Sequence, residues 1–209
     1  VKSFGKAAAN AVRAGFDSVE IHAAHGYLIH EFYSPLSNQR KDQYGGSYQN
    51  RVRFLHEIVA EVRKTIPDGM PLFVRISASD WTEGGWGIDD SIRLSQELYK
   101  AGVDLIDVSS GGNVHNASIP VGPGYQVHFA EMIREQNKEI GEGSRSPLLI
   151  SAVGMITEAK QADEIISSGK ADVVMMAREF LRNPRWPLAA AKELGMEITW
   201  PIQIERGKL

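Results

Sequence analysis

The sequence contains no cysteine. Disulfides, thiolate nucleophiles, iron–sulfur clusters and cysteine-bound zinc are therefore excluded within these residues, and a reducing cytoplasm is the expected compartment. No stretch approaches the length of an apolar membrane span. The amphipathic residues 1–14 lack the apolar segment and small-residue cleavage site of a secretory signal. We therefore expect no membrane partner.

An excess of charge of one sign is lacking as well. The chain carries 23 basic and 26 acidic residues, a formal net charge of −3, without long runs of like charge. Neither a nucleic-acid-binding patch nor a polybasic membrane surface is indicated. With 209 residues and 43% hydrophobic content, the chain can bury a core of single-domain size.

The sequence does contain one pattern repeated along its length, a helix followed by a short apolar run. Strands are predicted at residues 18–22, 72–77, 105–109, 148–153 and 172–177. Helices are predicted at 2–14, 50–65, from Asp89 or Asp90 to 101, from about 127, from a cap at Thr157, and in segments up to 194. A Gly/Ser-rich connection covers 141–146. Such alternation is typical of a parallel sheet covered on both sides or of a closed barrel.

The ends of the predicted strands favour the barrel. Five residues fall where a strand gives way to its loop: His22, Ser77, Ser109, Gly154 and Arg178. That edge is the active face of an α/β barrel, whereas a doubly wound sheet would gather ligands at one switch point, and no GxGxxG opens a helix. A complete barrel needs about 250 residues. We predict a (β/α)8 TIM barrel of which residues 1–209 form the C-terminal portion, without the first three βα units.

The segment HAAHGY (22–27) directly follows the first predicted strand. An imidazole can donate a hydrogen bond to a substrate carbonyl, and a tyrosine hydroxyl can deliver a proton to a carbanion or enolate. Spacing alone leaves open whether His22 and His25 act on a substrate or are structural. A metal site is less favoured, because HExxH is absent and no third ligand is placed.

Arg75 stands inside an otherwise apolar strand, where an unpaired guanidinium is costly to bury. Its partner is either an anionic cofactor group or a structural carboxylate such as Asp80 or Asp107. Small residues and one arginine follow the last three predicted strands: Ser110, Gly111, Val153, Gly154, Ala177 and Arg178. A glycine after a strand is usually only a turn. The joint placement on the final strands favours a phosphate site.

Five motifs carry a resemblance: HAAHGYLIHEF (22–32), SPLSNQRKDQYGGSYQNRVRF (34–54), FVRISASD (73–80), DVSSGG (107–112) and VGMI (153–156). Together they are similar to the old yellow enzymes. With MAREFLRNP (176–184) and ERGK (205–208), the ordered match resembles the bacterial NADPH dehydrogenase and xenobiotic reductase branch. The resemblance covers essentially all 209 residues.

The resemblance implies a barrel that binds FMN and passes hydride from NADPH to the C=C bond of an α,β-unsaturated carbonyl or nitro compound. It implies that His22 and His25 bind the substrate oxygen and that Tyr27 donates a proton. It places eight residues at the cofactor: His22, Arg75, Ser110, Gly111, Val153, Gly154, Ala177 and Arg178. The family often has glycine where this chain has Ala177, but a backbone N–H contact survives a methyl group.

The resemblance also bears on assembly. Arg206 matches a terminal arginine that reaches into a neighbouring subunit in this branch, which implies a homo-oligomer, although a charged tail by itself is usually solvated. The family's first three strands would precede Val1. A truncated chain, a split protein with a separate complementing chain and a half-barrel without catalysis all stay open. An isolated arc would expose two strand edges and an unfilled interior, which favours a fragment of a larger enzyme.

Two other functions compete with the oxidoreductase reading. A phosphate-binding aldolase or isomerase would need a Schiff-base lysine or a carboxylate base at a strand end, and none of the five strand ends presents a lysine. A non-catalytic scaffold is the other alternative. The sequence leaves the physiological alkene and the choice between NADPH and NADH undetermined.

Overall fold

Five parallel strands form one sheet in the sequential order β1-β2-β3-β4-β5. Their bounds are β1 Val19–Ala23, β2 Leu72–Ser77, β3 Leu105–Ser109, β4 Leu149–Val153 and β5 Val173–Met175. A doubly wound sheet reverses its strand order at a switch point, and this sheet does not. The predicted barrel class is therefore confirmed, as an arc of five consecutive βα units.

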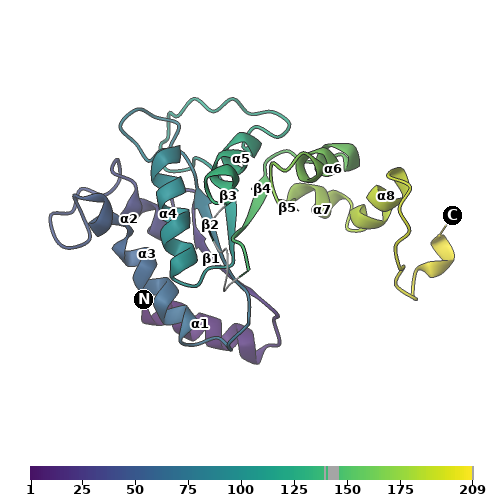
Figure 1. Ribbon diagram of the computed structural model, residues 1–209, viewed down its shortest axis with the longest axis horizontal. Helices are drawn as coiled ribbons and strands as arrows, with labels where there is room; N and C mark the ends of the chain where they lie inside the picture. Colours follow the sequence, from purple (N-terminus) through teal and green to yellow (C-terminus); the bar gives the residue numbers. More distant parts are fainter. Residues whose placement is uncertain (139, 141–145, 209) are drawn as a thin grey trace.

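The computed structural model describes residues 1–138, 140 and 146–208, so most of the predicted 141–146 connection lies outside the described residues. The helices are α1 Lys2–Arg13, α2 Leu28–Tyr33, α3 Tyr48–Arg63, α4 Ile88–Lys100, α5 Val127–Gln136, α6 Ala159–Ser167, α7 Arg178–Arg182 and α8 Trp186–Glu193, with a 3-10 turn η1 at Glu205–Gly207. Helix α1 packs on α3, and α4 packs on α5. Beyond α7 the chain leaves the body as an arm that ends at the C-terminus (Figure 1).

The hydrophobic core lies between the helices and the face of the sheet that they cover. Alternate strand residues point there and are completely buried: Val74, Ile76, Ile106, Val108, Ile150 and Ala152. Helix α3 contributes Ile58 and Val59, and α4 contributes Leu94 and Leu98, all with no exposed area. Each such side chain stabilises the fold by about 1.5–3 kcal/mol on burial. Apolar packing on this outer face therefore holds the arc together.

The inner face of the sheet carries a polar row. His22, Arg75, Asp107 and Ser151 occupy paired positions on β1 to β4. Side chains at paired positions of parallel strands point to the same face, so these four form one layer, with Glu20 one layer below. Barrel interiors are normally filled by branched apolar side chains. A charged layer there marks a candidate site.

Three local features differ from the sequence predictions. Helix α2 was not predicted, because its six residues are too few to display a helical period. Gly87, not Asp89 or Asp90, is the N-cap of α4, and Asp90 accepts a hydrogen bond from the Gly87 N–H at 3.4 Å. Glu158, not Thr157, caps α6, since the Thr157 N–H donates to the Gln161 side chain instead.

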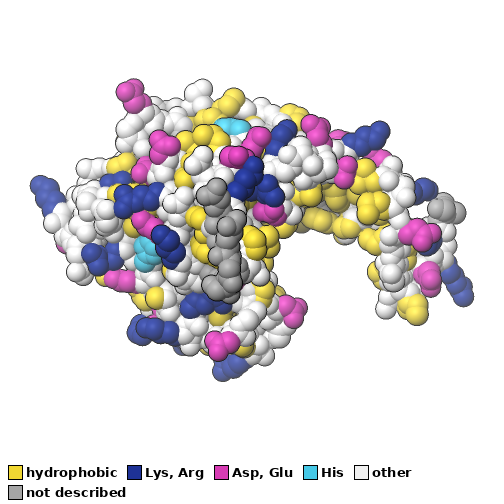
Figure 2. Space-filling model, viewed as in Figure 1, with side chains coloured by type: hydrophobic (Ala, Val, Ile, Leu, Met, Phe, Trp, Pro, Cys, Tyr) yellow, Lys and Arg dark blue, Asp and Glu magenta, His cyan; other side chains and the backbone are white. Residues whose placement is uncertain are grey.

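Helix α7 and the arm carry exposed apolar side chains, among them Leu181 on α7 and Met196 and Ile202 on the arm. Figure 2 shows apolar side chains gathered below α6 and α7 and on the adjoining part of the arm. Within residues 1–138, 140 and 146–208, no helix combines the length and apolar character needed to cross a bilayer. The same ranges hold no cluster of three or more His, Asp or Glu side chains arranged for a metal ion.

Candidate functional site

The carboxyl ends of the strands bring most of the predicted site residues together. A cavity of about 360 Å³ lies there. Six of the predicted residues line it: His25, Arg75, Val153, Gly154, Ala177 and Arg178. The ring centroid of His22 lies 5.3 Å from those of both His25 and Tyr27. The histidine pair, the tyrosine and the strand-end arginines thus occupy one edge of the sheet.

Five predicted residues do not line this cavity: His22 lies beside His25, Tyr27 lies beside His22, and three others are farther from it. Ser110 is buried behind it, where its hydroxyl accepts a hydrogen bond from Trp81 Nε1 at 2.9 Å. Gly111 is buried too, and its carbonyl accepts from the Ser77 hydroxyl at 2.8 Å. Arg206 lies in η1, on the arm, and is exposed. The structure therefore places Ser110 and Gly111 as supports of the site and does not bring Arg206 to it within this chain.

His25 sits in a tight turn. The Tyr27 N–H donates to the Ala24 carbonyl at 3.2 Å, and the two central residues, His25 and Gly26, have φ of 60° and 72°. Positive φ at both positions is typical of a type I′ turn. A Cβ on Gly26 would overlap the Gly112 carbonyl, and a Cβ on Gly112 would lie 2.6 Å from the His25 Cα. Gly26 and Gly112 thus allow the two loops to touch through their backbones, and this contact supports the left-handed backbone conformation of His25.

The His25 side chain is held by hydrogen bonds from neighbouring strand ends. Its Nε2 lies 2.6 Å from the Ser109 hydroxyl, and its backbone N–H donates to the Ser77 hydroxyl at 2.9 Å. Ser109 Oγ also lies 3.3 Å from Gln126 Oε1, which accepts from the Ser110 hydroxyl at 2.6 Å. The single Ser109 proton can therefore go to His25 Nε2, which leaves the proton of the neutral ring on Nδ1 as a donor for a ligand. The ring is therefore oriented from two strands before any ligand binds.

Gln126 is a site residue that the sequence analysis missed. Its Nε2 donates to the Val153 carbonyl at 3.0 Å, which turns Oε1 toward the hydroxyls of Ser109 and Ser110. The side chain is buried and lines the cavity. A single glutamine in a loop, next to the start of a helix, has no sequence pattern that would have identified it.

The electrostatic surroundings keep both imidazoles neutral. Burial, followed by the positive Arg75 and the neighbouring His22, lowers the pKa of His25 from 6.5 to about 4. The pKa of His22 is also lowered, by burial and then by Arg75, against an opposing effect of Asp107. At neutral pH the two rings are therefore N–H donors without charge.

Arg75 has a structural carboxylate partner. Its Nε lies 3.2 Å from Asp107 Oδ2, and the Ser151 hydroxyl donates to Asp107 Oδ1 at 2.6 Å. The geometry of the Arg75–Asp107 contact is not that of a hydrogen bond, so the buried Nε–H has no hydrogen-bond partner among the described residues. The ion pair with Asp107 keeps the Arg75 guanidinium in place, and its unsatisfied N–H leaves it able to donate a hydrogen bond to a further acceptor.

The far wall of the cavity is positively charged. Arg178 and Arg182 line it together with Arg75; Arg182 is ion-paired with Glu179 at 2.7 Å, so the net positive charge of this wall comes from Arg178. Gly154 has φ of 123°, and a Cβ there would lie 2.8 Å from Gln126 Nε2. Glycine at this position therefore lets Gln126 and Tyr125 lie close to the backbone, beside Arg178 and Arg182 at the cavity. An anionic group fits such a wall.

Comparisons with known proteins agree with this geometry. Residues 1–197 match the family described as NADH:flavin oxidoreductase / NADH oxidase. The chain is 55% identical over 207 residues to an NADPH dehydrogenase of Bacillus subtilis (strain 168), an alignment that covers 99% of this chain and 58% of that protein. The chain thus spans less than two thirds of the length of the curated relatives it matches.

Two solved structures share the fold. A 2-naphthoyl-CoA reductase in complex with 2-naphthoyl-CoA has a TM-score of 0.79 at 28% identity, covering 93% of this chain and 29% of its own. A morphinone reductase variant in complex with tetrahydroNAD has a TM-score of 0.69 at 26% identity, covering 97% of this chain and 50% of its own. In each case the similar region is a part of a longer protein.

Proposed function

The chain belongs to the NADH:flavin oxidoreductase / NADH oxidase family, and from this premise we propose that it is the C-terminal portion of an FMN-dependent NADPH dehydrogenase. The proposed reaction is hydride transfer from NADPH, by way of the flavin, to the C=C bond of an α,β-unsaturated carbonyl or nitro compound. One observation carries the proposal: His25, which is neutral and has His22 beside it, shares a single cavity with Arg75, Arg178 and Arg182, and these guanidinium groups fit an anionic cofactor.

The residues present fit FMN. Arg75 offers a buried N–H without a hydrogen-bond partner among the described residues, beside the cavity. Gly154, Ala177 and Arg178 line the cavity at the ends of the last two strands, where many barrels hold phosphate, and Arg178 supplies a guanidinium there. FMN, when bound, supplies reversible hydride transfer. Arg75 would stabilise negative charge on the reduced ring, and Arg178 would hold the phosphate.

His22 and His25 would bind and polarise the substrate. A neutral imidazole donates a hydrogen bond without adding a positive charge, and the lowered pKa values keep the rings in that form near neutrality. A donor to a carbonyl or nitro oxygen draws electron density from the adjacent double bond. Tyr27 is exposed next to His22, from which its hydroxyl would deliver the proton that completes the reduction.

We also propose that the three missing βα units complete the barrel. β1 and β5 are the edges of the sheet, and Glu20 and His22 are exposed on its inner face. Parallel sheets are normally buried on both faces, and the residues that the structure describes leave this face without a covering. The exposed Arg206 on the arm supports a homo-oligomer in which it reaches a neighbouring subunit. The absence of cysteine fits a cytoplasmic location.

A direct experiment tests the proposed function. The protein is expressed from its full natural reading frame and purified, its visible spectrum is recorded, and NADPH consumption is followed with cyclohexenone. We expect a bound-flavin spectrum and turnover that depends on flavin. A colourless protein that stays inactive after addition of FMN would contradict the proposal. Residues 1–209 alone should bind FMN weakly or not at all, because part of the site lies outside them.

A further inference from the structure

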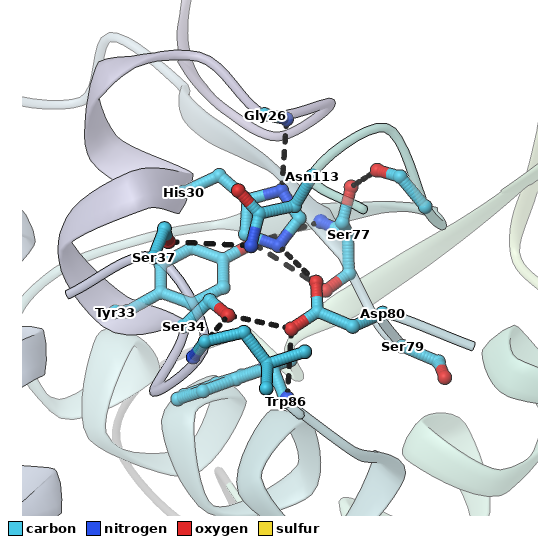
Figure 3. Close-up of polar contacts among 12 residues, drawn as sticks. Gly26, His30, Tyr33, Ser34, Ser37, Ser77, Ser79, Asp80, Trp86 and Asn113 are labelled. Carbon is cyan, nitrogen blue, oxygen red and sulfur yellow. Dashed lines mark hydrogen bonds and ion pairs between the residues drawn. The ribbon is translucent and has the colours of Figure 1, made fainter. Parts of the chain in front are cut away.

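A third histidine lies beneath the substrate turn and has no role in the function proposed above. His30 on α2 and Asp80 after β2 are both fully buried, with His30 Nε2 2.9 Å from Asp80 Oδ1. The other ring nitrogen, Nδ1, accepts a hydrogen bond from the Gly26 N–H at 3.0 Å. Figure 3 shows the ring of His30 between Gly26 and Asp80.

Asp80, like the His30 ring that it contacts, is fixed by hydrogen bonds. Its Oδ2 accepts hydrogen bonds from the Ser34 hydroxyl at 2.6 Å and from the Trp86 N–H at 2.9 Å. Burial raises the pKa of Asp80, but these bonds and the one to His30 outweigh burial and lower it below its usual value. Asp80 is thus a charged acceptor in a fixed orientation. The Tyr33 ring stacks on His30 with a centroid distance of 4.7 Å.

These contacts determine which nitrogen of His30 carries the proton. A backbone N–H only donates, so the Nδ1 that faces Gly26 holds a lone pair. The proton of the neutral ring therefore sits on Nε2 and points at Asp80. A carboxylate only accepts, so Asp80 enforces this tautomer. The same proton on Nδ1 would face the Gly26 N–H and break the contact.

The contact with Gly26 bears directly on His25. The N–H of Gly26 belongs to the peptide plane that follows the His25 Cα, and the direction of that plane is the ψ angle of His25. His25 is held at φ of 60°, a conformation that costs a non-glycine residue about 1–2 kcal/mol. A hydrogen bond that holds the peptide plane opposes relaxation of this strained residue. His30 thereby controls where the His25 ring points.

We propose that His30 is a positioning residue for His25, and that Asp80 selects the His30 tautomer that performs this role. The inference rests on the proposed substrate-binding role of His25. No proton is transferred in this role. Asp80 orients the His30 imidazole, His30 holds the peptide plane between His25 and Gly26, and that plane orients His25, the donor to substrate. Neither residue lines the cavity at the strand ends, so neither is expected to touch substrate.

Asp80→Asn tests the tautomer with almost no change of shape. The amide oxygen should remain with its two donors, Ser34 and Trp86, which turns the NH2 toward His30 Nε2. The His30 proton must then move to Nδ1, opposite the Gly26 N–H. We expect faster hydrogen exchange of the Gly26 amide, a changed His30 nitrogen NMR signature and about tenfold weaker phenol binding, with FMN content unchanged.

Two substitutions of His30 separate positioning from stability. His30→Asn keeps an acceptor near the position of Nδ1 and loses the contact with Asp80, whereas His30→Gln keeps a donor toward Asp80 and loses the acceptor for Gly26. We expect the asparagine variant to bind phenol within about twofold of wild type and the glutamine variant to bind about tenfold more weakly. Both should lose thermal stability. Ser34→Ala, which removes one bond to Asp80 Oδ2, is the matched control and should keep Gly26 protected.

The measurements use the full-length flavoprotein, with phenol titrated against the flavin absorbance and Gly26 exchange followed by NMR. Loss of phenol affinity in parallel with loss of thermal stability, equal for His30→Asn and His30→Gln, would overturn the proposal. So would unchanged Gly26 protection in Asp80→Asn. A wild-type protein without flavin would instead contradict the proposed function, and Gly26 exchange would still decide whether His30 holds the turn.

Discussion

The loops after β1 and β2 differ from those after β4 and β5 in how deeply their residues are buried. Beside the first pair, His30 and Asp80 are fully buried and both nitrogens of the imidazole have partners. Beside the second pair, Ala177 and Arg178 are exposed, and all three residues of β5 are only half-buried. One wall of the cavity is organised by this chain alone, and the other is open.

The difference separates two kinds of binding. A substrate oxygen meets donors whose direction is already established by serine, glutamine and backbone contacts, so little ordering accompanies binding. An anionic cofactor would meet guanidinium groups with room to move, and would itself supply the partner of the unsatisfied Arg75 N–H. We expect changes on the first wall to affect stability and substrate affinity, and changes on the second to affect cofactor affinity.

The largest expected effect comes from Gly112→Ala, which should disturb the organised wall. The new Cβ would lie 2.6 Å from the His25 Cα, and residue 112 has a φ of 92° that alanine rarely adopts. The clash and the strained φ both lower the free energy of unfolding. We expect a loss of about 3 kcal/mol in the free energy of unfolding, measured with urea. Gly84→Ala is the matched control, since its φ is 73° and its Cβ would meet nothing within 4 Å; it should cost about 1 kcal/mol. Equal losses would contradict a special role for the contact.

Replacing His22 and His25 together by alanine should separate substrate from cofactor. Two donated hydrogen bonds are lost, so phenol should bind about a hundredfold more weakly to the full-length flavoprotein. The FMN content should stay at the wild-type level, because the open wall is untouched. Titration against the flavin absorbance and the ratio of flavin to protein absorbance measure the two effects. Loss of FMN with unchanged phenol affinity would show that the histidines bind the cofactor and not the substrate.

Arg178→Gln should weaken FMN binding, in contrast to the histidine substitutions, which should weaken phenol binding. Removing a guanidinium from the cationic wall should weaken FMN binding about tenfold, with little change in unfolding free energy because Arg178 is exposed. Arg185→Gln is the control, since Arg185 is exposed in the same segment and does not line the cavity. FMN affinity is measured by fluorescence titration of the apoprotein. An equal loss of FMN affinity in the two variants would show that Arg178 acts through the net charge of the protein and not through contact with the cofactor.

The smallest expected effect concerns pH. Partial desolvation, followed by Asp107, raises the pKa of Glu20 from 4.5 to about 7, so Glu20 in the folded state keeps its proton to higher pH than in the unfolded state. Because Glu20 is exposed, solvent screening keeps the effect on stability small. Between pH 4.5 and 7 Glu20 therefore lowers stability as pH rises, whereas His25, with its pKa lowered from 6.5 to about 4, raises it. Glu20→Gln should gain stability over the unsubstituted protein across this window, with unfolding midpoints as the measurement. A constant difference from pH 4.5 to 7 would contradict the shift.

Much of the fold follows from local pattern. The strands predicted at 72–77 and 105–109 agree with β2 and β3 to the residue, because each is a buried apolar run bounded by turn residues. Five such runs separated by helices predict a parallel sheet, and the polar residues at their ends predict the edge where the cavity lies. Helix α2 is shorter than two turns, so its sequence carries no period to detect.

Much of the candidate site does not follow from local pattern. Arg75 was expected to need a partner, but Asp80 and Asp107 were equally available in the sequence, and only the β2–β3 register placed Asp107 beside it. Asp80 instead contacts His30, fifty positions earlier in the chain. Such pairs depend on how strands align and loops fold over one another, which no spacing encodes.

The sequence by itself determined the βα repeat, the strand ends that carry His22 and Arg178, the place of Arg75 inside an apolar strand, and the family resemblance. These are properties of short segments, and a segment's period and composition suffice for them. Only the tertiary structure decided that His25 is held in a left-handed turn, that Gln126 joins it, and that His30 and Asp80 lie behind it. Each of these depends on groups remote in sequence meeting at hydrogen-bond distance, and that happens only once the strands have packed into one sheet.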